Sequence, residues 1–333
     1  MNAPATSAAP AAVGHSGDHA ALIQTLHAIV GPDQLKTDPD ITAAYSRDMM
    51  PLAPSGIPLA VVFPSDTAQV SAIVRACAAA GVPIVPRGAG SGLTGAANAV
   101  DGAVSVVMTR MNRILEIDEG NRLAVVQPGV VNLDFRTEVE SRGLFYAPDP
   151  SSYDWCTIGG NLNTNAGGLC CVKYGVTTDA VLGLEVVLAS GEVLRTGRRT
   201  VKGVAGYDIA GLMVGSEGTL GVITEITLRL RPALTGVPRT VVGAFGRLVD
   251  AGRAVALVTR LGLSPSALEL LDRTCLTAVE DWKHLGIEAS AAVLLLARVD
   301  TPGEADDAES AALAEAFDRA GALWAERSTD DVE

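Results

Sequence analysis

The distribution of glycine is the feature that most constrains this 333-residue chain, because 23 of its 35 glycines lie between residues 81 and 221. Glycine loses much backbone entropy on folding, so such a density is expected where a chain turns tightly or approaches a ligand closely. The glycines follow no collagen-like period, and hydrophobic residues make up 48% of the chain, enough for a sizeable core. We therefore search for function in the loops of residues 81–221.

Charge and hydropathy exclude several classes of protein. The formal net charge is −13, and no basic stripe with interleaved aromatic residues is present, so nucleic acid is not an expected partner. The longest apolar runs are far shorter than a membrane span, so no transmembrane segment is expected. Residues 1–17, rich in Ala, Pro and Ser, lack the features of a signal peptide and are predicted to form a disordered tail.

Cysteine and histidine give no metal-site pattern. The five cysteines are odd in number and lack CxxC spacing, which argues against a disulfide framework, a zinc ribbon or an iron–sulfur cluster. His15 and His19 have i,i+4 spacing but lie in the N-terminal tail, so we predict no metal site. The Cys170–Cys171 pair is either redox-active or simply two small semi-buried residues, and the second interpretation is favoured.

Hydrophobic periodicity predicts two α+β domains: residues 18–235, with a core over 56–234, and residues 236–333. In the first, Ser65 or Asp66 is placed to begin a helix that Gly81 ends, and Ser190–Gly191 forms a hairpin turn. The second has a ferredoxin-like order in which no strand of any length follows the final helix, so we expect it to be truncated. The expected helices span about 18–30, 66–80, 132–142, 248–261, 274–284 and 305–320, and the expected strands 59–63, 82–86, 104–108, 114–117, 123–127, 182–188, 192–197, 221–230, 240–245, 267–271 and 291–299.

The sequence G-x-G-x-x-G occurs at Gly90, Gly92 and Gly95, directly after an expected strand. A Rossmann site requires a crossover helix to open there, and the eight residues before Val104 leave no room for one. Glu116 and Asp118 lie about twenty positions further on, where a Rossmann site has the acidic residue that binds the ribose. Without the crossover helix, we interpret this spacing as a coincidence. Two alternatives stay open, a plain glycine-rich turn and a loop whose backbone N–H groups cradle an anion, with Arg87 adding charge at its entrance.

Three more polar loops favour the ligand interpretation. They are APDPSS at residues 147–152, TIGGNLNTNAGG at 157–168 and GSEGTLGVIT at 215–224. Four glycine- or proline-rich loops returning within one domain suggest a single long polar ligand threaded between them.

These segments resemble a known family. PRGAGSGLTG, APDPSS, TIGGNLNTNAGG, LGLEVVLASGEVL and GSEGTLGVITEI occur in the same order and at similar spacing in FAD-linked oxidases. The fold class that the resemblance implies is α+β, with an FAD-binding domain of the p-cresol methylhydroxylase and vanillyl-alcohol oxidase type, made of two α+β subdomains, and a partial ferredoxin-like cap domain. Within the family, the chain most resembles the branch of the glycolate oxidase flavin subunit and the D-lactate and D-2-hydroxyglutarate dehydrogenases.

The resemblance implies a set of FAD-binding residues. The first loop would surround the diphosphate with backbone amides, the second would line the adenosine–diphosphate side, the third would run beside the ribityl chain and the isoalloxazine, and the fourth would close around the adenine. A histidine of the first loop bonds covalently to the flavin in several relatives, whereas Ser91 stands at that place here, so non-covalent FAD is expected. In order, these residues are Arg87, Gly88, Ala89, Gly90, Ser91, Gly92, Leu93, Thr94 and Gly95; Pro148, Asp149, Ser151 and Ser152; Gly159, Gly160, Asn161, Thr164, Asn165 and Gly167; and Glu217, Gly218, Gly221, Val222 and Ile223.

The resemblance also implies an activity and partners. A small 2-hydroxy acid such as glycolate, D-lactate or D-2-hydroxyglutarate would be oxidised by hydride transfer to the flavin. The electrons would pass to a quinone, a cytochrome or an electron-transfer protein. The catalytic base stays unknown, and the family's divalent-metal site and carboxylate-binding residues belong to a later segment that has no match here. The alternative is an FAD-binding module or subunit that is inactive alone. We expect a cytoplasmic protein, peripheral to the membrane at most through a partner subunit.

Overall fold

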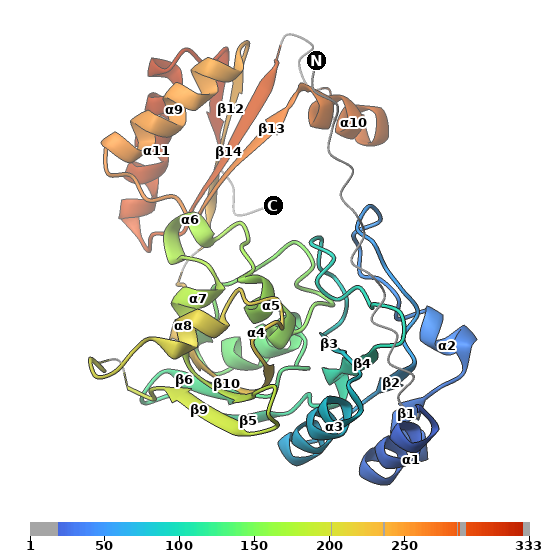
Figure 1. The fold of residues 1–333 in the computed structure, drawn as a ribbon. Helices are drawn as coiled ribbons and strands as arrows, with labels where there is room; N and C mark the ends of the chain where they lie inside the picture. The colour runs from blue at the N-terminus through green and yellow to red at the C-terminus, as the bar shows by residue number, and fades with distance from the viewer. Residues whose placement is uncertain (1–18, 201, 236, 285, 287–290, 329–333) are drawn as a thin grey trace.

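The computed structural model describes residues 19–328 except 201, 236, 285 and 287–290. The chain forms an N-terminal body up to β11 (Arg231–Pro232) and a smaller C-terminal body from β12 (Arg239–Phe245) onward (Figure 1). The tail predicted over residues 1–17 lies outside the described residues. No helix in the described part of the chain is long and apolar enough to cross a membrane.

The first sheet of the N-terminal body has four strands in the order β1-β2-β4-β3. Strands β2 and β3 run parallel to β4, whereas β1 is antiparallel to β2. Helices α1 and α3 pack against this sheet, and Val70, Ile73 and Val74 of α3 are buried. Each such side chain contributes about 1.5–3 kcal/mol of burial free energy. The elements are β1 (Leu35–Lys36), β2 (Ala60–Val62), β3 (Ile84–Arg87), β4 (Val104–Val107), α1 (His19–Val30) and α3 (Thr67–Ala80).

The limits of α3 confirm the capping signals in the sequence. The Asp66 carboxylate accepts a hydrogen bond from the Gln69 backbone N–H at 2.8 Å and so satisfies a free donor of the first turn. Gly81 ends the helix in the left-handed region, at φ 65°. Between β3 and β4 the glycine loop contains no helix, although the two strands are parallel neighbours. The rejection of a Rossmann crossover is therefore confirmed.

The second sheet is antiparallel, with five strands in the order β5-β6-β10-β8-β9. Helices α4, α5 and α8 cover one face, where Phe135, Leu162 and Ile226 are fully buried. Val187 and Val222 of this sheet pack into the core of the first sheet, so the two sheets share a continuous interior. The elements are β5 (Ile114–Asp118), β6 (Leu123–Val126), β8 (Val181–Val187), β9 (Val193–Gly197), β10 (Val222–Arg229), α4 (Asn132–Glu140), α5 (Ile158–Thr164) and α8 (Ile209–Met213).

Shorter elements connect these layers. A two-stranded ribbon joins β11 to β7 just before the chain leaves the N-terminal body. The others are α2 (Pro39–Ala43), β7 (Leu144–Phe145), α6 (Cys171–Tyr174), α7 (Thr177–Ala180) and the 3-10 turns at Pro32–Gln34 and Met108–Arg110.

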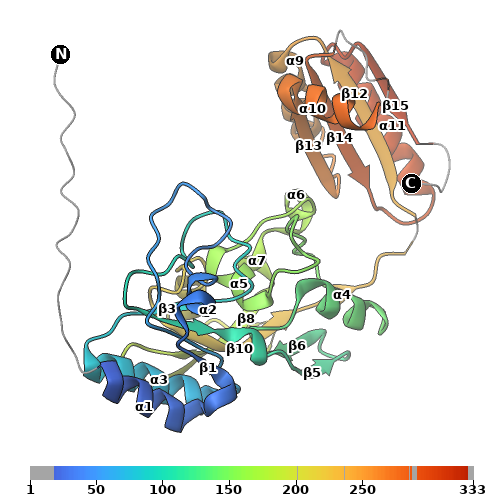
Figure 2. The same ribbon diagram turned by 90° about the vertical axis from the view of Figure 1, so that its right-hand side faces the viewer.

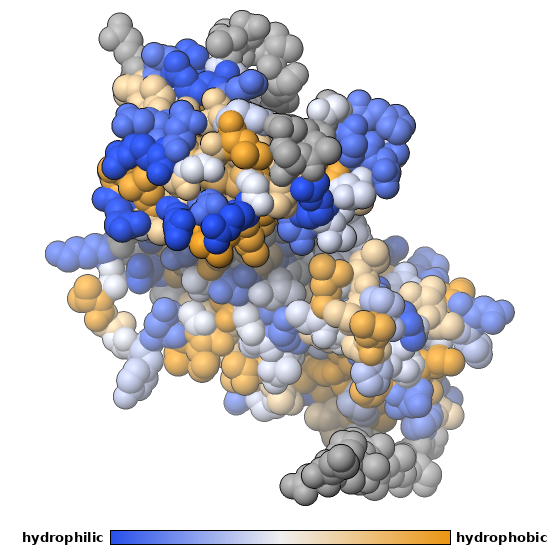
Figure 3. All heavy atoms as spheres, turned by 90° about the horizontal axis from the view of Figure 1, so that it is seen from above, coloured by the Kyte–Doolittle hydropathy of each residue, from blue (hydrophilic) through white to orange (hydrophobic). Residues whose placement is uncertain are grey.

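The C-terminal body is one antiparallel sheet in the order β13-β14-β12-β15, with α9 and α11 packed together on one face (Figures 1 and 2). Phe245 and Phe317 meet at its centre with their ring centroids 6.0 Å apart. Seen from above, hydrophilic side chains gather over this body with smaller hydrophobic groups between them (Figure 3). The remaining elements are β13 (Ala267–Asp272), β14 (Val293–Val299), β15 (Trp324–Arg327), α9 (Leu248–Arg260), α10 (Arg273–Lys283) and α11 (Glu304–Arg319).

Strand β15 corrects one prediction. We expected no strand of any length after the final helix, but residues Trp324–Arg327 pair with β12 through Val241–Ala244 and complete the ferredoxin-like sheet. Its four residues are too few to show a period of two, and an edge strand carries polar residues such as Glu326 and Arg327. The hydrophobic pattern of Trp324–Arg327 is therefore too short and too polar to predict this strand from the sequence.

Helix α6 contacts the C-terminal body, as Figure 1 shows. The buried carboxylate of Asp300 pairs with the Lys173 ammonium and accepts a hydrogen bond from the Tyr174 hydroxyl at 2.6 Å. Beside them, the Arg298 guanidinium donates to the Cys170 sulfur at 3.2 Å. These side chains form polar contacts between the two bodies.

Candidate functional site

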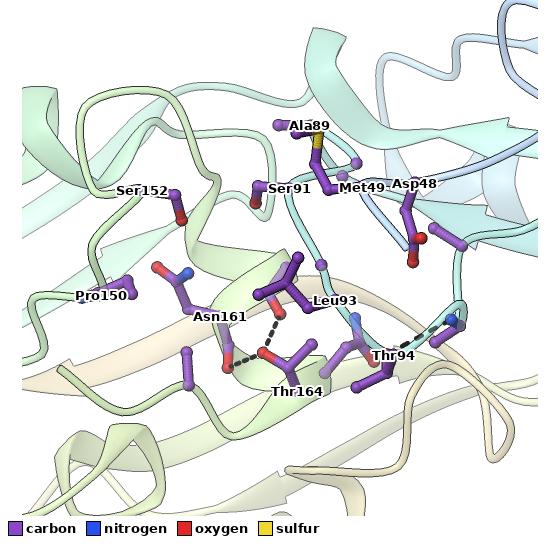
Figure 4. Close-up of a pocket in the computed structure, with 18 of the residues that line it drawn as sticks. Asp48, Met49, Ala89, Ser91, Leu93, Thr94, Pro150, Ser152, Asn161 and Thr164 are labelled. Carbon is purple, nitrogen blue, oxygen red and sulfur yellow. Dashed lines mark hydrogen bonds between the residues drawn. The ribbon is translucent and has the colours of Figure 1, made fainter. Parts of the chain in front are cut away.

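The predicted polar loops meet around a cavity of about 390 Å³ in the N-terminal body (Figure 4). Ser152 and Asn161 lie on one side in this view, Asp48 on the other, and residues of the glycine loop between them. The volume is within the range of small-molecule sites. Predicted residues in its lining are Gly88, Ala89, Gly90, Ser91, Gly92, Leu93, Thr94, Ser151, Ser152, Gly160, Asn161, Thr164, Glu217 and Gly218.

The glycine loop offers unpaired backbone donors to this cavity. The N–H groups of residues 89–94 donate to no acceptor among the described contacts. The loop is held by the Met49 N–H, which donates to the Gly92 carbonyl at 3.1 Å. Successive free amides in a turn form a concave site for an anion. The cradle therefore favours the anion-binding interpretation of the motif over a plain turn.

Three glycines of this loop, Gly88, Gly90 and Gly95, have a neighbour too close to a built Cβ for a side chain to fit without a shift. A Cβ on Gly88 would lie 2.4 Å from the Thr157 hydroxyl oxygen, and a Cβ on Gly90 would lie 2.2 Å from a terminal nitrogen of Arg87. Gly90 also has φ +83°, a left-handed conformation that costs other residues free energy. Glycine at these positions lets the loop pack against α5 on one side and against Arg87 on the other.

Arg87 begins the glycine loop, but its side chain is not in the lining of the cavity. Its guanidinium donates to the Ala97 carbonyl at 3.3 Å and lies 5.7 Å from the ring centroid of Tyr45. Burial lowers the pKa of Arg87, and attraction by the Asp48 carboxylate opposes that shift.

The segment around α5 forms a fixed wall. Thr157 caps the helix, since its hydroxyl accepts from the Gly160 N–H at 3.3 Å. The side chain of buried Asn161 accepts from the Asn132 amide at 2.9 Å and donates to the Cys156 sulfur at 3.1 Å. Asn163, in contrast, has a buried side-chain oxygen with no partner among the described contacts. This oxygen is an acceptor still available beside the cavity.

Two carboxylates, Asp48 and Glu217, also line the cavity. Burial raises the pKa of Glu217; a hydrogen bond from Thr94 opposes this shift, and the nearby Asp48 charge adds to it. Glu217 has φ +54°, which is uncommon outside glycine. The site thus combines backbone donors for an anion with carboxylate acceptors for hydroxyl or amino groups.

The other predicted residues lie next to the cavity. Arg87, Gly159, Val222 and Ile223 line a second space of about 20 Å³ that shares Gly88 and Gly160 with the first. Behind the wall, Asp149 is buried and accepts from the Cys170 N–H at 3.0 Å, and the Pro148 carbonyl accepts from Asn132. Gly95, Asn165, Gly167 and Gly221 line neither space, although each belongs to one of the loops that form the site.

Sequence reasoning missed nine lining residues. Pro150, Asn163 and Ala166 stand within motifs already singled out, so their neighbours were a usable signal. Asp48 and Met49 belong to a segment without a motif and reach the cavity only through tertiary packing. The nine are Asp48, Met49, Pro86, Ala96, Ala97, Pro150, Trp155, Asn163 and Ala166.

The cysteines form no disulfide among the described residues, and Cys77, Cys156 and Cys170 are buried. Burial raises the pKa of Cys77 and of Cys170 to about 12, so both remain thiols at neutral pH. No group of three or more metal-ligating side chains occurs in the part of the chain that the structure describes. Asp208 accepts from the Gly211 N–H at 2.9 Å and caps α8, a local structural role.

Two family models match the chain. The FAD binding domain matches residues 58–197, and the C-terminal domain of FAD linked oxidases matches residues 237–332. The first match contains the glycine loop and the α5 wall, and the second contains the sheet of the C-terminal body. Both halves of the chain therefore point to the same family.

Individual proteins agree with the family models. The chain is 44% identical over 276 residues to the glycolate oxidase subunit GlcD of Bacillus subtilis (strain 168), which covers 83% of the chain and 58% of that protein. It is 42% identical to the D-2-hydroxyglutarate dehydrogenase of Stutzerimonas stutzeri (strain A1501), over 67% of the chain and 48% of that protein. The chain thus spans about half the length of these curated relatives.

A solved structure supports the fold alone. p-Cresol methylhydroxylase with substrate bound superposes with a TM-score of 0.78 over 94% of the chain and 66% of the other, at 22% identity. The predicted fold class, an α+β FAD-binding domain of this type followed by a ferredoxin-like domain, is confirmed.

Proposed function

The chain belongs to the FAD-linked oxidases, and its cofactor is FAD. From that premise we propose that FAD binds without a covalent bond in the 390 Å³ cavity and that the chain serves in the oxidation of a small 2-hydroxy acid. We assign residues 18–235 to the FAD-binding domain and 236–333 to the cap domain.

The free amides of residues 89–94 are the observation that carries the proposal. A diphosphate has no hydrogen-bond donors and carries negative charge, so six successive N–H groups that have no acceptor among the described contacts suit it. Gly88 and Gly90 support this assignment, since a Cβ would lie 2.4 Å from the Thr157 hydroxyl oxygen at Gly88 and 2.2 Å from an Arg87 nitrogen at Gly90, so a neighbour of the loop would have to shift in either case. The unpartnered oxygen of Asn163 is available to a donor of the same ligand. The described residues therefore fit the cofactor.

The composition of the lining supports non-covalent binding. Among the described residues that line the cavity there is no His, Cys or Tyr, the side chains able to attach covalently to a flavin ring. Ser91 occupies the loop position at which several relatives carry the attached histidine. Denaturation of the loaded protein is expected to release all the flavin into solution.

The substrate class is supported by the relatives. Two proteins that share 44% and 42% identity with the chain are named for glycolate and D-2-hydroxyglutarate, both 2-hydroxy acids. FAD, when bound, supplies a two-electron acceptor for such an oxidation. The role of this chain's residues is to bind the cofactor, orient it and exclude water from it. Since one of these relatives is named a subunit, we also propose partner subunits and a separate electron acceptor.

One observation favours the alternative, a module that binds FAD but needs a partner for catalysis. No Lys, Arg or His is among the described residues that line the cavity, so none of them supplies a cation for the substrate's carboxylate there. In this case the FAD site would be complete and the acid-binding site would not.

An anaerobic titration separates the two. The purified chain is loaded with FAD, and glycolate, D-lactate or D-2-hydroxyglutarate is added while the visible flavin absorbance is followed, with L-lactate as the matched control. Bleaching by one of the three acids and not by L-lactate is the result expected of the oxidising enzyme. Stable FAD binding without bleaching by any acid supports the module, and failure to bind FAD contradicts both.

A further inference from the structure

Asp48 lies in the cavity lining with one carboxylate oxygen unused. The side chain is buried, with 8% of its residue surface exposed. Its Oδ1 accepts a hydrogen bond from the Met50 N–H at 2.8 Å, and its own N–H donates to the Asn98 side chain at 2.7 Å. Its Oδ2 is shielded from solvent and has no partner among the described contacts. A buried carboxylate oxygen without a donor is costly, which makes it a candidate ligand contact.

The position of Oδ2 ties it to the glycine loop. A Cβ built on Gly92 would lie 3.5 Å from this oxygen, so Asp48 sits against the segment whose amides are free. In Figure 4 the Asp48 side chain lies on the side of the cavity opposite Ser152 and Asn161. Asp48 is therefore next to the place where a diphosphate would be held.

Neighbouring charges do not complete the contact. The Arg87 guanidinium is attracted to Asp48 but donates its hydrogen bond to the Ala97 carbonyl. Glu217, on the same cavity, repels Asp48 and brings no donor. The unused oxygen thus needs a hydroxyl or amino donor that the described protein contacts do not provide.

We propose that Asp48 is a FAD-binding residue whose Oδ2 accepts a hydrogen bond from a hydroxyl group of one of the two sugar-like chains that flank the diphosphate. The inference rests on the proposed FAD site. The ribose and the ribityl chain both carry hydroxyls directly beside the phosphates, and both present the same chemistry to a carboxylate. A further phosphate on that hydroxyl would be repelled by the Asp48 carboxylate.

The sign of the effect of neutralising Asp48 tests this idea. FAD carries negative charge on its diphosphate, so by charge alone removal of the carboxylate would strengthen binding. Asp48→Asn keeps an oxygen for the Met50 N–H but places an NH₂ group where Oδ2 stood, so the ligand hydroxyl would have to turn and accept from that group, and the charge-assisted hydrogen bond is lost. A hydrogen bond to a charged group changes affinity at least about tenfold. We therefore expect Asp48→Asn to bind FAD at least about tenfold more weakly.

The experiment titrates the full chain with FAD and follows flavin fluorescence. It compares the wild type with Asp48→Asn, with Asp48→Ala, which removes both carboxylate oxygens without adding a donor, and with Asp318→Asn, the same change of charge on the exposed surface of α11. Both Asp48 variants are expected to lose affinity, and the control is expected to match the wild type. Unfolding midpoints of the apo proteins identify any variant that fails to fold. If one Asp48 variant does not fold, the FAD affinity of the other Asp48 variant tests the proposal.

Titrations with ADP and with riboflavin 5′-phosphate then locate the hydroxyl. The loss caused by Asp48→Asn is expected with only one of these halves, the one that carries the partner hydroxyl. Equal or tighter FAD binding by the Asp48 variants, or an equal loss with both halves, overturns the inference. A wild type that does not bind FAD refutes the proposed function itself, so the two failures are distinguishable.

Discussion

Replacement of Gly90 by alanine tests the packing of the glycine loop most sharply. At φ +83° an L-residue pays about 1–2 kcal/mol for the left-handed conformation. The new Cβ would lie 2.2 Å from the Arg87 Nη2, so the guanidinium must move and give up its bond to the Ala97 carbonyl, worth about 1 kcal/mol. We expect Gly90→Ala to lower the free energy of unfolding by about 2–3 kcal/mol.

Gly102→Ala is the matched control. Gly102 has a similar φ of +75°, but a Cβ there would meet no atom within 4 Å, so only the backbone strain of about 1–2 kcal/mol remains. Urea unfolding of the apo proteins measures both changes. FAD titration then distinguishes an effect on FAD binding from an effect on stability alone, because Gly90 lines the cavity and Gly102 does not. Gly90→Ala is expected to bind FAD at least about tenfold more weakly, and Gly102→Ala as the wild type does. Equal unfolding costs together with equal FAD affinities would refute the reasoning.

Three further predictions concern the rest of the molecule. Asp300→Asn breaks the buried ion pair with Lys173 and removes about 1.5–3 kcal/mol from the contact between the two bodies. Limited proteolysis of the connecting segment 233–238 should become faster while FAD affinity is retained, and an unchanged cleavage rate would contradict this prediction. Burial raises the pKa of Glu217 above 4.5, so its contribution to stability is present below pH 4.5 and is lost as pH rises. Glu217→Gln should therefore raise the unfolding midpoint at neutral pH but not in acid, and a rise in acid alone would exclude burial of this carboxylate as the cause. Tyr146 is fully buried, and its hydroxyl has no partner among the described contacts. Tyr146→Phe should therefore stabilise the chain by about 1 kcal/mol, measured by urea unfolding. A loss of stability would show that the hydroxyl has a partner.

Local signals made much of the fold predictable. Asp66 and Gly81 mark the limits of α3 because a cap and a left-handed glycine act within one turn of a helix. Ser190–Gly191 turns the hairpin of β8 and β9 for the same local reason. Strand β15 was not predicted because its four residues form an edge strand, which is defined by pairing with β12 and not by the pattern of its residues.

The candidate site was predictable where it is contiguous. The loop over residues 88–94 and the α5 segment line the cavity as expected from their glycine content. Asp48 was not predictable, since no motif surrounds it and about forty positions separate it from the loop that it contacts. The direction of the Arg87 side chain was also not predictable, because it depends on tertiary contacts with Tyr45, Asp48 and the Ala97 carbonyl.

A crystal structure of the chain loaded with FAD tests the central claim most directly. The account predicts one FAD per chain, with its diphosphate oxygens accepting hydrogen bonds from several of the backbone N–H groups of residues 89–94. A bound FAD whose diphosphate lies away from this loop, or a chain that remains free of FAD at saturating concentration, would contradict it.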